Sequence, residues 1–101
     1  MEHRERRGPV QKWEYAEFTW TRSRTSALPD QAAVDDAWGA VEFSGTRETI
    51  QVDSQDFWST IHTLGQDGWE MVGTAVETDT RAEGSTSTYS YYSYVFKRPL
   101  P

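Results

Sequence analysis

The chain has 101 residues, with 10 Lys and Arg against 16 Asp and Glu, and a formal net charge of -6. This length suits one small domain with a modest core, and the acidic balance argues against a mainly electrostatic grip on nucleic acid or anionic lipid. The absence of cysteine excludes disulfides, thiolate nucleophiles and cysteine-based metal sites. No stretch approaches the roughly 18 apolar residues of a membrane span, so we expect a soluble, cytoplasmic protein.

The N-terminal segment, residues 1–9, mixes both charges and ends in Gly-Pro. It carries almost no apolar side chain, so little offsets the chain entropy that ordering would cost. We therefore expect a disordered charged tail over residues 1–9 and a single domain over residues 10–101.

A first strand is predicted over residues 12–22, KWEYAEFTWTR, which is rich in aromatic residues. Its large apolar residues fall at odd positions up to Tyr15 and at even positions from Phe18. Such a change of phase predicts a bulge or bend near Ala16 and Glu17.

The following stretch, residues 23–37, has no sustained period and contains a proline, so we expect a loop there. A hairpin then has its arms at residues 38–44 and 47–52. Gly45 and Thr46 lie between the arms and supply the turn signal.

One amphipathic helix is predicted next, after Asp53 and Ser54, either of which can cap its N-terminus. Four apolar side chains form a single stripe for the core, namely Phe57, Trp58, Ile61 and Leu64. The helix is expected to end within residues 65–68, because a glycine there allows a left-handed C-terminal cap.

Two further strands, over residues 69–78 and 89–98, complete the pattern, and Pro99 ends the second. The order is strand, hairpin, helix, hairpin. It predicts an α+β fold, with an antiparallel sheet of about four to five strands and one helix packed on one face. The first and last strands are expected to be neighbours.

Three short motifs carry a resemblance to a known family. They are KWEY at residues 12–15, LGQDGWEMV at residues 64–72 and VFKRP at residues 95–99. In this order they resemble a small bacterial and phage family, domain of unknown function 4177. The resemblance implies a short α+β domain and no established biochemical role. The segment at residues 16–52 is longer than the family pattern implies and contains the extra hairpin.

Residues for catalysis or metal binding are sparse. His62 is the one histidine of the predicted domain, and it falls on the flank of the helix, where contact with solvent is the commoner role. The pairs Asp35 with Asp36 and Asp53 with Asp56 have structural explanations as loop and helix-cap residues. No nucleophile motif and no histidine spacing for metal is present. We therefore expect no enzymatic activity, no metal and no cofactor.

The strands carry more large apolar side chains than one covered face can hold. We assign to the helix-covered face Trp13, Tyr15, Val41, Phe43, Ile50, Val52, Trp69, Met71, Tyr92, Tyr94 and Phe96. A second set then points the other way, namely Val72, Val76, Tyr89, Tyr91 and Val95. Either the second face is a contact surface, or residues 16–37 fold back over it.

We favour a non-catalytic interaction module that self-associates through this second face and also presents its loops to another protein. The alternative is a small-ligand or nucleotide-binding protein with an aromatic pocket at a subunit interface. In that case Lys12, Lys97 or Arg98 would meet an anionic group. The simplest reading of these basic residues is that they solubilise a strand end and blunt a sheet edge.

Overall fold

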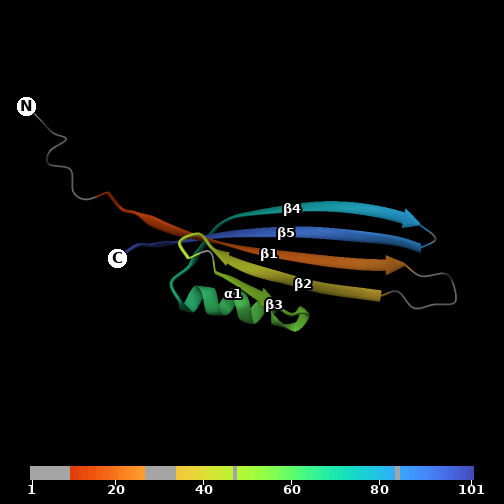
Figure 1. Cartoon of the computed structure of the whole chain (residues 1–101), viewed down its shortest axis with the longest axis horizontal. Helices are drawn as coiled ribbons and strands as arrows, with labels where there is room; N and C mark the ends of the chain where they lie inside the picture. Colours follow the sequence, from red (N-terminus) through yellow and green to blue (C-terminus); the bar gives the residue numbers. More distant parts are fainter. Residues whose placement is uncertain (1–9, 27–33, 47, 84) are drawn as a thin grey trace, which may run out of the picture.

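The computed structural model describes residues 10–26, 34–46, 48–83 and 85–101. In this part of the chain five antiparallel strands form one sheet in the order β3-β2-β1-β5-β4, with one α-helix beside it (Figure 1). The elements are β1 (Trp13–Ser26), β2 (Val34–Phe43), β3 (Thr49–Val52), a 3₁₀ turn (Ser54–Asp56), α1 (Phe57–Gln66), β4 (Glu70–Glu83) and β5 (Ser85–Pro99). The predicted α+β class, element order and β1–β5 adjacency are confirmed.

The predicted loop at residues 23–37 is wrong at both of its ends. The pairing of β1 with β2 continues to Thr25 opposite Val34, and residues 27–33 lie outside the described part. Mostly polar residues form these strand ends without an apolar period, because no described element covers either sheet face there. Residues 16–26 and 34–37 therefore belong to the sheet itself and do not fold back over its second face. The predicted tail, residues 1–9, also lies outside the described residues.

The first aromatic residues of β1, Trp13 and Tyr15, lie on the sheet face opposite to the one predicted. Pairing with β2 and β5 runs through Ala16 and Glu17 without a shift, so no bulge is present there. Alternation then places Phe18 towards α1 and Trp13 and Tyr15 on the other face. Aromatic residues occupy both odd and even positions of β1 because both sheet faces carry aromatic side chains. The one register shift lies in β4, between Met71 and Gly73.

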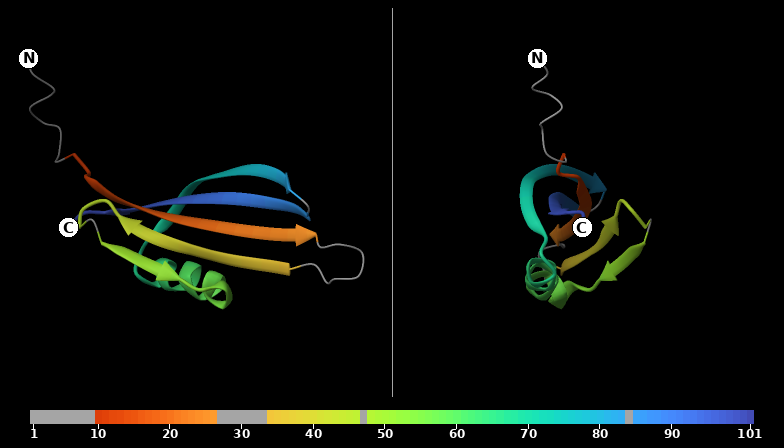
Figure 2. Two further views of the ribbon diagram at one scale, coloured as in Figure 1. Left: turned by 45° about the vertical axis from the view of Figure 1, so that its right-hand side comes forward. Right: turned by 90° about the vertical axis from the view of Figure 1, so that its left-hand side faces the viewer.

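The core lies where α1 crosses the sheet. The Phe57 ring centroid lies 5.5 Å from that of Phe18 and 5.1 Å from that of Trp20. The buried residues are Ala16, Phe18, Trp20, Val41, Val52, Leu64, Trp69 and Phe96. Figures 1 and 2 show that the four long strands run on beyond α1, so the helix covers only part of one sheet face.

The helical stripe was predicted correctly for three of its four residues. Phe57, Ile61 and Leu64 contact the core, whereas Trp58 is 76% exposed. At about 100° per residue, Trp58 turns away from the direction shared by the other three. The predicted N-terminal cap is also wrong, because no side chain caps the helix and the 3₁₀ turn precedes it instead.

The C-terminus of α1 ends as predicted, at a left-handed glycine. Gly68 has φ of 87°, and its amide donates to the Gly65 carbonyl at 3.1 Å. The Trp69 amide donates to the Leu64 carbonyl at 2.9 Å. These two bonds form a Schellman motif, and its usual hydrophobic contact is supplied by Leu64 and Trp69, which are both buried. The prediction that Trp69 is a core residue is confirmed.

Gly39 allows β2 to approach the large rings of β1. A Cβ atom built on Gly39 would lie 2.3 Å from the Thr19 carbonyl oxygen and 2.7 Å from the Trp20 ring. Only a residue without a side chain fits there unless backbone moves. Gly39 thus fixes how closely Trp20 can pack beneath the start of α1.

We expect Gly39→Ala to destabilise the fold by about 1–3 kcal/mol, because the added methyl group overpacks a site bounded by backbone. Gly65→Ala is the matched control, since a Cβ on Gly65 would meet nothing within 4 Å. It should stabilise α1 by up to about 1 kcal/mol through higher helix propensity. Urea unfolding of both variants measures the two effects. Changes of the same sign in their free energies of unfolding would contradict the packing role of Gly39.

Candidate functional site

The sheet face opposite α1, which we call the open face, has no other described element packed over it. Tyr15, Trp38 and Tyr91 remain 47%, 45% and 38% exposed there. Strand pairing and alternation place on this face Trp13, Tyr15, Glu17, Thr19, Thr21, Ser23, Asp36, Trp38, Ala40, Glu42, Glu70, Gly73, Ala75, Glu77, Asp79, Tyr89, Tyr91, Ser93, Val95 and Lys97.

An aromatic patch, which we define as Trp38, Tyr89 and Tyr91, lies towards one end of the open face. Thr21 of β1 pairs with Trp38 on one side and with Tyr91 on the other. The rings of Tyr89 and Tyr91 are stacked, with centroids 6.4 Å apart and planes 11° apart. Large rings with polar tips are typical of contact surfaces, because they offer much area for little conformational entropy.

The next row of the open face, towards Val95, carries only small side chains. Thr19 of β1 pairs with Ala40 on one side and Ser93 on the other, and Ala75 follows on β4. A hollow of about 470 Å³ lies here, with Thr19, Ala75 and Tyr91 among its lining residues. The open face therefore has a raised aromatic row directly beside a low row.

The far end of the open face holds a cation against an aromatic ring. The Lys97 ammonium lies 4.0 Å from the centre of the Trp13 ring, and Tyr15 pairs with Lys97 across the strands. Between this end and the low row, Ser93 donates a hydrogen bond of 2.7 Å to the Glu17 carboxylate.

The five predicted interface residues do not all share the open face. Tyr89, Tyr91 and Val95 lie on it, as predicted. Val76 pairs with Tyr92 and so lies on the α1 side, where it is 63% exposed beyond the helix. Val72 sits at the register shift of β4, 46% exposed. This shift reverses the alternation on which the assignment of Val76 depended.

Trp38, Trp13 and Tyr15 are open-face residues that the sequence pattern did not assign to it. For Trp38 the sequence held a signal. In residues 38–44, Trp38 falls at an even position and the buried Val41 at an odd one, so alternation sends their side chains to opposite faces.

The residues predicted for an anionic ligand are separated by the fold. Arg98 lies on the α1 side of β5, where its Nε donates to the Glu14 carboxylate. Its Nη1 donates to the Asp67 carbonyl at 2.9 Å, and its guanidinium lies 4.4 Å from the centre of the Trp69 ring. Lys97 points to the opposite face, and Lys12 is exposed before β1.

Arg98 is therefore a structural residue at the C-terminus of α1, where a cation also complements the helix dipole. It brings together parts of all three motifs noted in the sequence, which are Glu14, Asp67 with Trp69, and Arg98 itself. With its donors engaged in this way, the guanidinium is poorly placed to take a ligand.

Other chemical features are few in the part of the chain that the structure describes. His62 is exposed on α1, as predicted. Within residues 10–26, 34–46, 48–83 and 85–101 no group of three or more His, Cys, Asp or Glu could hold a metal ion. No helix among these residues is long and apolar enough to cross a membrane. Burial and the neighbouring Tyr92 raise the pKa of the Tyr94 hydroxyl.

Comparison with known proteins finds no family model that matches the chain and no matching curated protein. The resemblance to the domain family named above stays a prediction.

We expect Arg98→Ala to destabilise the protein by about 1–3 kcal/mol, because it removes charge-assisted hydrogen bonds and a cation–π contact at a partly buried site. Arg98→Lys should recover only part of this loss, since a lysine lacks the planar fork. Lys97→Ala is the control, with an expected loss of about 1 kcal/mol or less for an exposed cation–π pair. Equal losses for Arg98→Ala and Lys97→Ala in denaturant unfolding would contradict the anchoring role.

The raised pKa of Tyr94 predicts a loss of stability at alkaline pH. Above pH of about 10 the unfolded chain releases the Tyr94 proton more readily than the folded chain, so rising pH favours unfolding. Tyr94→Phe lacks this proton and should lose less stability than wild type over that range. Thermal unfolding from about pH 8 to about pH 11 measures the difference, which should be absent at the lower end. Parallel pH profiles for the two proteins would contradict the assignment.

Proposed function

We propose that the protein is a non-catalytic interaction module that self-associates through the open face. The observation that carries this proposal is the exposure of Trp38 and Tyr91, on either side of Thr21, on a sheet face without a covering element among the described residues. Aromatic side chains of this kind bury about 150–250 Å² each in an interface, which is a large favourable term.

A second copy of the chain suits this face because its relief is self-complementary. In an isologous dimer the same surface is used twice, so each raised row must meet a low row. A two-fold axis that runs across the strands between Thr19 and Thr21 meets this requirement. It seats Trp38 and Tyr91 of each copy on the partner's low row, as in an aligned sheet-on-sheet packing.

The proposal predicts that wild type sediments at about twice its chain mass of 11.6 kDa. A Trp38→Glu, Tyr91→Glu double variant should sediment as a monomer, because carboxylates in an apolar interface lose hydration without gaining a partner. Trp58→Glu is the matched control, since Trp58 is 76% exposed on α1 and lies outside the open face. It should keep the wild-type mass.

Circular dichroism separates loss of association from loss of folding, because the core beneath α1 is untouched in the double variant. A monomeric wild type at the concentrations tested would contradict the proposal, and so would a double variant that keeps the wild-type mass. The expected cytoplasmic location and any further protein partner stay predictions.

A further inference from the structure

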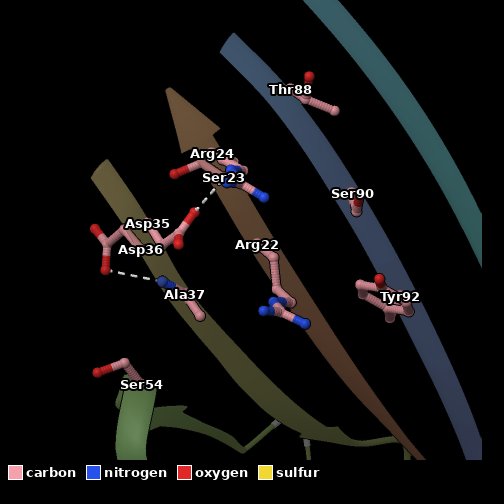
Figure 3. A pocket seen from close by; sticks show the side chains of 10 residues that line it. All are labelled: Arg22, Ser23, Arg24, Asp35, Asp36, Ala37, Ser54, Thr88, Ser90 and Tyr92. Atoms are coloured by element: carbon pink, nitrogen blue, oxygen red, sulfur yellow. Dashed lines mark hydrogen bonds and ion pairs between the residues drawn. The ribbon is translucent and has the colours of Figure 1, made fainter. Parts of the chain in front are cut away.

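The α1 side of the sheet continues beyond the helix as a polar surface. Phe57, the first residue of α1, lies over Trp20 of β1. Arg22 and Arg24 follow at two and four residues further along the same face of this strand. They therefore lie past the N-terminal end of the helix, where the 3₁₀ turn at Ser54 is the one described element outside the sheet that lines the same surface (Figure 3).

Arg22 occupies the middle of this surface between two small residues. Its directly paired neighbours are Ala37 on β2 and Ser90 on β5. Their short side chains leave a hollow of about 460 Å³ around the arginine, which falls within the size range of small-molecule sites. Tyr92, which is stacked on Tyr94, lines it on the side nearer the core.

The hollow is lined by hydrogen-bond donors that come from three separate segments. Figure 3 shows Arg22 and Arg24 on β1, Thr88 and Ser90 on β5, and Ser54 at the start of the helical segment. Each arginine presents five N–H donors and each hydroxyl one. The Ser54 hydroxyl already donates to the Gln55 side-chain oxygen at 3.2 Å. Arg22, flanked by Arg24 and Ser90, therefore supplies most of the donors that an acceptor-only ligand requires.

The two carboxylates at the rim of the hollow have other partners. Asp35 pairs with Arg24 at 3.7 Å, and Asp36 accepts the Ala37 amide at 2.8 Å. Arg22 has no ion pair or hydrogen bond with the rest of the described chain. The Arg24–Asp35 pair is long, and its side chains are 70% and 67% exposed, so it yields readily to a competing anion.

From this geometry we infer that the hollow is a binding site for a small phosphate, with Arg22 as its main ligand residue. A phosphate group offers three strong acceptor oxygens. These match the guanidinium of Arg22, the hydroxyl of Ser90 and the nearby Arg24. A carboxylate has only two oxygens, which a single guanidinium can satisfy. The chain's net charge of -6 disfavours long polyanions and leaves a small molecule as the occupant.

The test is a titration followed by ¹⁵N–¹H correlation spectra at constant ionic strength. Inorganic phosphate and glycerol phosphate are added separately, because they distinguish a site for the free ion from one for a phosphate monoester. Both should give saturable shifts of the Arg22 side-chain N–H and of the Arg22 and Ser90 amides. Acetate should bind more weakly than either.

The variants separate a specific site from a general charge effect. Arg22→Gln should weaken phosphate binding roughly tenfold or more, as expected when a charged hydrogen-bonding partner is lost. The phosphate affinity of Arg22→Lys should lie between those of wild type and Arg22→Gln, because lysine keeps the charge but lacks the planar guanidinium. Lys97→Gln is the matched control, since it removes one positive charge from the open face and should leave binding unchanged.

Three outcomes would overturn the assignment: linear shifts without saturation in wild type, full binding by Arg22→Gln, or an equal loss in Lys97→Gln. Arg22 is exposed and makes no contact that the fold needs, so the variants should fold as wild type does. The site lies on the face opposite the proposed dimer contact, so its test does not depend on self-association.

Discussion

The difference in length between α1 and the strands governs the rest of the structure. Ten residues of helix span about 15 Å, whereas the 14 residues of β1 span about 46 Å. A single helix of this size can bury only the segment around Phe18 and Trp20. No described element covers the other sheet face or the far part of this one.

Contacts at both ends hold the short helix in place. At its start Phe57 packs on Trp20, which lies low on the sheet because Gly39 leaves room beside it. At its end the Schellman motif directs Trp69 into the core. Arg98 of β5 donates to the Asp67 carbonyl just after the helix and to the Glu14 carboxylate of β1. These contacts place the helix over Phe18 and Trp20 and leave the hollow around Arg22 beyond its start.

Local patterns predicted the fold well, because the helix, its glycine cap and the hairpin around Gly45 each depend on neighbouring residues. They failed where a choice between faces was needed. Period-2 alternation says that Tyr15 and Phe18 face opposite ways but not which side the helix takes. Val76 was misplaced for a related reason, since one extra residue near Met71 inverts the alternation along all of β4.

The candidate surfaces were harder to predict, because register decides them. Trp38 and Tyr91 share one row of the open face, and Arg22 lies beside Ser90, only through pairings with β1 that no local pattern encodes. Towards the far end of the β1–β2 pairing, no other described element packs on either sheet face. Local burial therefore does not set the strand register there. It is inherited from the core, where Ala16 faces Phe96 and the pairing then runs without a shift to Ser26. A slip of one residue would exchange the two surfaces, carrying Arg22 to the aromatic face. The buried core thus specifies the chemistry of surfaces that it does not touch.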